Sequence, residues 1–281
     1  MLAPALAVRS DGVGGATVMR SPVPLGAYDR CIGVWLERWA RETPSEIAFA
    51  ERTAAGDWRK LTWAETRHAV GSLAQSLLDR QLPAGKPLVI LSENSVDHLL
   101  LMLASMHVGR PVCSVSTAYC RQTKDFGKIA GIVATLDPAL IFAADGAAYA
   151  PAIIACGTSA SVVLGRDVDR VPGSDALARM LQAEESPSVV RSFESVQPDD
   201  HAKYLLTSGS TGHPKVVINT HRMLCANQQM IAQTWRFLAR KKPVLLDWLP
   251  WSHTFGGNHD LNLVLRHGAR CISTMGVLRP A

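Results

Sequence analysis

The sequence predicts an α/β protein with doubly wound, mostly parallel sheets. Short apolar runs of strand length alternate with longer stretches whose apolar residues recur every three or four positions. Several of these runs are apolar throughout, as in strands that are covered on both faces. Capping and turn residues separate the segments, and alternating strands and helices of this kind form parallel sheets.

The first elements expected in the chain are a helix, two strands and a second helix. Apolar residues within 32–39 recur at helical spacing, and residues 47–51 and Trp58–Thr62 are expected as strands around a glycine turn. Thr62 and Glu65 have the spacing of a capping box, so a helix is expected to follow them.

The middle of the chain repeats the alternation of strand and helix. Ser95 is expected to cap a leucine-rich helix that stops at Gly109. Helices are also expected near residues 125–136 and 147–156. The expected strands are Leu88–Leu91, 112–115, Leu140–Ala143 and Ser161–Leu164.

We expect four parts in the chain. Residues 1–20 lack periodicity and are expected to be a disordered tail, and 21–165 form a first α/β subdomain. Residues 166–200 are more polar, hold one short helix at 175–182, and link the two subdomains. Residues 201–281 form a second α/β subdomain, which carries a helix from 220 to about 239, a strand Val244–Asp247 and a helix closed by Gly268.

Composition is typical of a globular protein of a reducing compartment. The 281 residues are 47% hydrophobic and 19% charged, with a net charge of +5 and a pI of about 9.0. The basic residues are scattered, apart from a cluster at 240–242, so binding to nucleic acid is not indicated. Six cysteines without a Cys-x-x-Cys spacing favour a cytoplasmic location, with neither disulfides nor a metal site. No run is apolar and long enough for a membrane span, and the oligomeric state is left open.

The stretch from Thr207 to Lys215 carries the clearest chemical signal. Two runs with β character flank a series of small, hydroxyl-bearing residues that ends in a lysine. Backbone N–H groups, hydroxyls and one ammonium together make a surface of donors that suits a polyphosphate. The residues expected to bind it are Thr207, Ser208, Gly209, Ser210, Thr211, Gly212 and Lys215. A Walker loop is excluded, because that loop has a different glycine spacing and opens directly into a helix.

This loop resembles the signature loop of the adenylate-forming acyl-CoA synthetases. Residues 61–65, 111–116 and 249–256 are similar to other stretches of that family, and residues 217–220 and 226–230 resemble bacterial feruloyl-CoA synthetases most closely. The resemblance extends from about Ser21 to about Ala269. One departure is Val216, which stands where the family usually has glycine.

The resemblance implies an AMP-forming ligase of aromatic acid catabolism, with ATP, Mg²⁺ and coenzyme A as its cofactors. A carboxylic acid such as ferulate would be converted to an acyl-adenylate and then to a CoA thioester. It implies that Lys215 and His253 act in catalysis. It also implies that His253, Phe255, Gly256 and Gly257 border the acid pocket.

The relatives implied by this resemblance are much longer. Their later segments supply the adenine pocket and a mobile domain with a catalytic lysine, and no counterpart follows residue 272 here. We therefore expect the incomplete N-terminal large domain of such an enzyme, a truncated fragment with little or no activity of its own.

Two alternatives stay open at this point. Ser210 lies in a sequence close to the Gly-x-Ser-x-Gly elbow of serine hydrolases, although Ser208 replaces the first glycine and an elbow leads into a helix. The second alternative is that the chain is a module that only binds a nucleotide or a partner, or a non-functional remnant. A metal site that joins His253, His259 and His267 is disfavoured, because the last two are eight residues apart on one expected helix.

Overall fold

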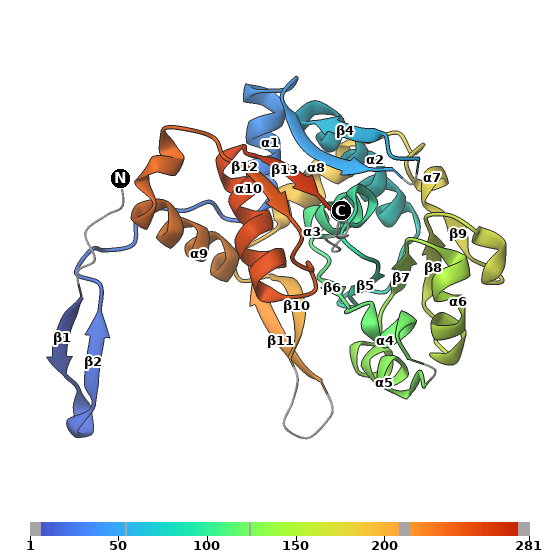
Figure 1. The fold of residues 1–281 in the computed structure, drawn as a ribbon, viewed down its shortest axis with the longest axis horizontal. Coiled ribbons are helices and arrows are strands. Elements are labelled where there is room, and N and C mark those ends of the chain that lie inside the picture. The colour runs from blue at the N-terminus through green and yellow to red at the C-terminus, as the bar shows by residue number, and fades with distance from the viewer. Residues whose placement is uncertain (1–6, 54, 124, 208–213, 275–281) are drawn as a thin grey trace.

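The computed structural model describes residues 7–53, 55–123, 125–207 and 214–274. These residues form a seven-stranded sheet, a four-stranded sheet and a separate two-stranded hairpin. In Figure 1 the four-stranded sheet lies at the top, and the hairpin of β10 and β11 points downward from the centre.

The seven-stranded sheet has the order β11-β10-β6-β5-β7-β8-β9. All its neighbouring strands are parallel except β10 and β11, which form an antiparallel hairpin. This confirms the predicted α/β fold with a mostly parallel sheet. The strands are β5 (Leu88–Leu91), β6 (Val112–Ser114), β7 (Leu140–Ala143), β8 (Ser161–Leu164), β9 (Asp175–Ala176), β10 (His201–Thr207) and β11 (Lys215–Thr220).

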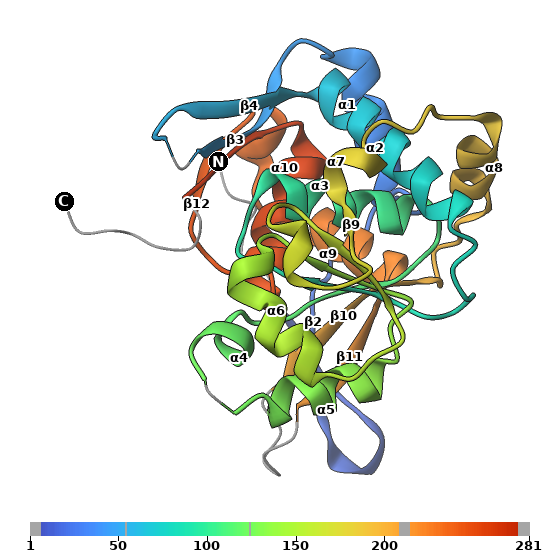
Figure 2. The same ribbon diagram turned by 90° about the vertical axis from the view of Figure 1, so that its right-hand side faces the viewer.

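Helices cover both faces of this sheet, as Figure 2 shows. Within β5, Leu88 and Ile90 belong to one core cluster, whereas Val89 and Leu91 belong to another. Successive side chains of a strand point to opposite faces, so an entirely apolar strand needs a core on each side. The first core packs against α1 (Gly33–Glu42), α2 (Trp63–Asp79) and α3 (Val96–His107), and the second against α4 (Ala118–Arg121), α5 (Gly127–Leu136) and α6 (Gly146–Ala155).

The four-stranded sheet joins segments from both ends of the described chain. Its order is β12-β13-β3-β4, with strands β3 (Ile47–Arg52), β4 (Trp58–Thr62), β12 (Val244–Asp247) and β13 (Arg270–Ser273). The expected division of the chain into two subdomains at 166–200 therefore does not hold for the sheets, because each of the two larger sheets contains strands from both sides of this segment. Strand β13 pairs with β3, and β10 pairs with β6, because pairing satisfies backbone groups irrespective of distance along the chain.

Two further expectations differ from the structure. Part of the expected disordered tail forms an antiparallel hairpin of β1 (Val8–Asp11) and β2 (Thr17–Arg20), with the 3₁₀ turn Val13–Gly15 between the strands. The linking segment holds the 3₁₀ turn Val168–Arg170 and two helices, α7 (Leu177–Met180) and α8 (Pro187–Ser195), instead of one helix. Ser186 caps α8 by accepting a hydrogen bond from the Ser188 N–H.

The predicted caps are confirmed where local sequence determines them. The Thr62 hydroxyl accepts a hydrogen bond from the Glu65 N–H, and the Glu65 carboxylate accepts one from the Thr62 N–H. Ser95 caps α3, and Gly268 closes α10 (Leu261–His267) in the left-handed conformation. The expected helix from residue 220 is α9 (His221–Thr234), followed by the 3₁₀ turn Arg236–Ala239. No helix of the described chain is long and apolar enough to cross a membrane.

Candidate functional site

The predicted phosphate loop joins β10 to β11 at the carboxyl end of β10. Thr207 lies directly opposite Lys215 in the hairpin, and both residues are exposed. Val216, which departs from the family pattern, is a half-buried strand residue that packs against the second core. The other predicted phosphate-binding residues (Ser208, Gly209, Ser210, Thr211 and Gly212) lie outside the described residues.

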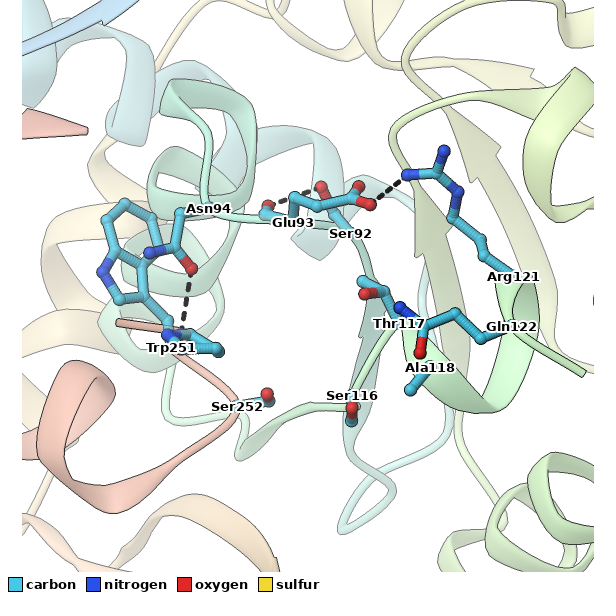
Figure 3. A pocket seen from close by; sticks show the side chains of 11 residues that line it. Ser92, Glu93, Asn94, Ser116, Thr117, Ala118, Arg121, Gln122, Trp251 and Ser252 are labelled. Carbon is cyan, nitrogen blue, oxygen red and sulfur yellow. Dashed lines mark hydrogen bonds and ion pairs between the residues drawn. The ribbon is translucent and has the colours of Figure 1, made fainter. Parts of the chain in front are cut away.

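A first cavity of about 500 Å³, here named the strand-end cavity, opens where β5 and β6 end. Residues that follow these two strands form its walls, together with the loop after β12 (Figure 3). Carboxyl ends of parallel strands are the usual place for ligands in α/β sheets. The lining residues are Ser92, Glu93, Asn94, Ser116, Thr117, Ala118, Arg121, Gln122, Pro250, Trp251 and Ser252.

Glu93 separates the strand-end cavity from a second cavity, the switch-point cavity, of about 320 Å³. Its carboxylate pairs with Arg121 and accepts a hydrogen bond of 2.9 Å from the Tyr149 hydroxyl. Burial, and then the charge of Glu93, raise the pKa of Tyr149, so the phenol stays protonated as a donor. The switch-point cavity lies between the ends of β5 and β7, which are neighbours in the sheet. The strand that follows β5 in the chain lies on one side of this pair, and the strand that follows β7 lies on the other, so the pair marks the topological switch point.

Asn94 connects the strand-end cavity to the loop that carries His253. Its amide donates a hydrogen bond of 2.7 Å to the Leu249 carbonyl and accepts one of 2.9 Å from the Trp251 N–H. The Trp251 indole donates to the buried Asp247 carboxylate at 2.7 Å. These contacts fix the loop after β12 against the end of β5.

Replacing Asn94 by leucine is expected to destabilise the chain by about 2 to 6 kcal/mol. The change leaves one carbonyl and one N–H without their buried partners, and each such loss costs about 1–3 kcal/mol. Urea unfolding followed by circular dichroism measures the effect. Gln122→Leu is the matched control, because Gln122 lines the same cavity but is exposed. Equal midpoints for the two variants would contradict the role assigned to Asn94.

A third cavity of about 500 Å³, here named the α9 cavity, lies between α9 and the π-helical turn Phe255–Asp260. The Phe255 and His259 rings stack at 4.6 Å along one wall, and Asn258 donates a hydrogen bond of 3.0 Å to the Asn219 side chain. Apolar and amide side chains thus alternate around it. The lining residues are Asn219, Met223, Leu224, Asn227, Thr254, Phe255, Asn258 and His259.

The four residues predicted to border the acid pocket lie near this cavity in different ways. Phe255 lines it with 58% of its surface exposed. His253 is exposed and lies between Ser252, which lines the strand-end cavity, and Thr254, which lines the α9 cavity. Gly256 and Gly257 are buried and do not line the cavity. A Cβ on either residue would lie within 2.6 Å of a backbone oxygen. These glycines make room for the chain at 249–251.

Sequence reasoning missed several polar residues around the cavities. Asn94 and Glu93 had a usable signal, because they directly follow a strand of the parallel sheet. Gln228, within the stretch 226–230 on α9, is fully buried. Lys203 is also buried, which no local pattern indicates, since lysines are almost never buried.

Comparison with solved structures confirms the fold. ATP-bound MatB from Rhodopseudomonas palustris superposes with a TM-score of 0.66 at 24% identity, over 87% of this chain and 45% of that one. The inhibitor-bound N-terminal domain of FACL13 from Mycobacterium tuberculosis gives a TM-score of 0.70 at 21% identity, over 89% of this chain and 58% of that one.

Curated relatives are similar over most of this chain but are longer themselves. The 4-coumarate–CoA ligase-like 4 of Oryza sativa subsp. japonica is 30% identical over 245 residues, which are 84% of this chain and 42% of that protein. The peroxisomal OPC-8:0-CoA ligase 1 of Arabidopsis thaliana is 31% identical over 66% of this chain and 32% of its own length. The inactive atromentin synthetase invA4 of Paxillus involutus is 26% identical over 75% of this chain and 20% of its own length.

The chain therefore spans less than half the length of these curated relatives. The family model described as "AMP-binding enzyme" matches residues 36–280, which include the β10–β11 hairpin and all three cavities. By this match the chain belongs to the family of AMP-binding enzymes.

Proposed function

We propose that this chain carries the ATP-phosphate and acid-binding part of an AMP-forming carboxylate–CoA ligase for aromatic acids such as ferulate. The observation that carries the proposal is the course of β11. Lys215 begins this strand beside the phosphate loop, and Asn219 near its other end lines the α9 cavity. Four residues of extended strand span about 13 Å. One strand thus connects a site for phosphates with a site for an organic acid.

In the proposed reaction a carboxylate oxygen of the acid attacks the α-phosphorus of Mg-ATP. The bond from that phosphorus to the β-phosphate oxygen breaks, giving an acyl-adenylate and pyrophosphate. The Lys215 ammonium and the Thr207 hydroxyl, which lie opposite each other in the hairpin, are proposed to stabilise the charge on the leaving phosphates. Coenzyme A thiolate would then attack the acyl carbon and displace AMP.

His253 is proposed to act at the junction of the two substrates. It is exposed at the start of the π-helical turn, and its carbonyl accepts a hydrogen bond of 2.8 Å from the Gly257 N–H. Its chain neighbours Ser252 and Thr254 line the strand-end cavity and the α9 cavity, so we propose that the imidazole reaches the junction of the two. It can there donate a hydrogen bond to the acid carboxylate or to a phosphate oxygen.

The lining of the α9 cavity supports an aromatic acid that bears a hydroxyl group. The stacked rings of Phe255 and His259 offer a surface for a flat ring. The Asn258 carboxamide oxygen is buried beside this cavity and has no hydrogen-bond partner among the described residues, so a phenol that reaches it would supply the missing donor. The similarity to a 4-coumarate–CoA ligase-like protein agrees with this choice of substrate class.

Titration calorimetry of the purified chain with ferulate, cinnamate and Mg-ATP tests this function. Ferulate is expected to bind about tenfold more tightly than cinnamate, because only ferulate carries the phenolic hydroxyl and a hydrogen bond of this kind contributes about 1.4 kcal/mol. Equal affinities for the two acids, or no binding of Mg-ATP, would contradict the proposal.

Pyrophosphate exchange separates a ligase from a module that only binds nucleotide. We expect weak exchange or none from this chain alone, and strong exchange from a full-length relative assayed in parallel. Strong exchange by the chain itself would show that residues 1–281 suffice for the first half-reaction. The serine hydrolase alternative lacks support, because the loop that contains Ser210 leads into strand β11 and not into a helix.

A further inference from the structure

Three consecutive carbonyls of the π-helical turn accept hydrogen bonds from buried side chains outside it. The Lys203 ammonium donates to the Gly257 carbonyl at 2.9 Å. The Gln228 amide donates to the carbonyls of Asn258 at 3.1 Å and His259 at 3.2 Å. π-Helical turns are rare, and they often occur at functional sites. Hydrogen bonds to three successive carbonyls fix the position of this turn.

Lys203 reaches this turn from the seven-stranded sheet. It lies in β10, where it pairs with Val112 of β6 and Asn219 of β11, and only 1% of its surface is exposed. A Cβ on Gly257 would lie 3.1 Å from the Lys203 Nζ and 2.3 Å from the Trp251 carbonyl oxygen. The turn is therefore enclosed between the lysine on one side and the loop after β12 on the other.

The burial of this ammonium is unfavourable for stability. Desolvation lowers the pKa of Lys203 to about 8, so at neutral pH the chain keeps a mostly charged amine away from water. The described residues provide no carboxylate within ion-pair distance of it. A buried charge that costs stability calls for an explanation other than stability.

We propose that Lys203, assisted by Gln228, is a positioning residue that holds the π-helical turn so that Phe255 and His259 face the α9 cavity. The inference rests on the proposed function in one respect, namely that this cavity receives the acid. Lys203 stands four residues before Thr207 in the same strand, so β10 connects the ATP-phosphate loop with the acid-binding wall.

Lys203→Met and Gln228→Leu are the test variants, and Thr66→Val is the control. Both test changes keep side-chain length or volume and remove the donors to the turn. Thr66 is buried in α2 and donates to the Thr62 carbonyl at 2.7 Å, so its variant loses one buried hydrogen bond away from the cavities. Hydrogen exchange read by mass spectrometry, thermal unfolding, and calorimetry with ferulate and Mg-ATP are measured for all three.

We expect amide exchange in residues 255–262 to accelerate at least tenfold in both test variants and to stay unchanged in the control. Lys203→Met is expected to unfold at the same temperature as the unmodified chain or higher, since a buried charge is removed. Its affinity for ferulate is expected to fall about tenfold, while its affinity for Mg-ATP changes less than twofold. A residue with only a structural role would not produce this separation.

Unchanged exchange in residues 255–262 of Lys203→Met would overturn the proposal, as would an equal loss of affinity for both ligands. If the unmodified chain does not bind ferulate, the proposed function fails. In that case the exchange data alone still decide whether Lys203 holds the turn.

Discussion

A fall in pH from 7 to 4.5 is expected to unfold the chain. Burial is the main cause that lowers the pKa of His98, His221 and His267 to about 4 and that of His107 to about 3. In the unfolded chain these imidazoles have a pKa of about 6.5. Between pH 6.5 and 4 the unfolded state binds more protons than the native state, so stability is lost as the pH falls.

The expected size of this effect is a large part of the stability of a domain. A depression from 6.5 to about 4 corresponds to about 3 kcal/mol for one group. Even a third of that for each of the four histidines amounts to about 4 kcal/mol, against a usual total of about 5–15 kcal/mol. Circular dichroism during acid titration would give the midpoint of unfolding, expected between about pH 5 and 6.

His107 is the best single test of this cause. Its ring stacks on Phe193 at 4.3 Å between α3 and α8, and neither ring nitrogen has a hydrogen-bond partner in the described chain. The Glu37 carboxylate lies 3.5 Å from Nε2, without the geometry of a hydrogen bond. Burial and then the charge of Arg67 lower the pKa of His107 by more than the Glu185 carboxylate raises it. His107→Leu is expected to lower the midpoint by several tenths of a pH unit.

His68→Gln is the control for this titration. His68 is exposed, so its replacement removes a histidine without changing a buried group, and the midpoint should not move. If His107→Leu unfolds at the same pH as the unmodified chain, the buried histidines do not determine its acid limit.

Replacing Lys215 by methionine is expected to weaken Mg-ATP binding about 30- to 100-fold. A hydrogen bond from an ammonium to a phosphate contributes about 2 to 3 kcal/mol, and methionine removes it while keeping a similar length. Lys215 is exposed at the end of the hairpin, so the change should leave thermal unfolding within about 1 °C. Titration calorimetry at low ionic strength is the measurement, because salt screens this contribution.

Lys60→Met is the matched control for this effect. Lys60 is an exposed lysine of β4 in the other sheet, far from the hairpin in Figure 1. The Lys60→Met variant tests whether the loss of one positive charge anywhere on the surface weakens ATP binding. The role of Lys215 would be refuted if both variants bound Mg-ATP with the same affinity.

Local sequence determined most of the elements of this protein. Leu88–Leu91, Leu140–Ala143 and Ser161–Leu164 form strands with the predicted bounds, since short apolar runs between turn residues have few alternatives. The Thr62–Glu65 capping box and the glycine end of α10 were predictable as well. In the capping box and at the end of α10 the interacting groups are at most four residues apart.

The phosphate-binding role of residues 207–215 is a prediction from the spacing of the loop. Thr207 and Lys215 are the members that the structure places, facing each other across the hairpin. Their action on ATP stays a prediction until the binding experiments are made.

Only the tertiary structure decided which strands share a sheet and which polar groups are buried. Three contacts join residues that are 54 to more than 200 positions apart in the chain. They are the pairing of β13 with β3, the hydrogen bond of Asn94 to the loop after β12, and the hydrogen bond of Lys203 to Gly257. The free energy of such contacts depends on desolvation and on the partner available in space. Neither is encoded in a short window of sequence, and so the elements were predictable while the walls of the cavities were not.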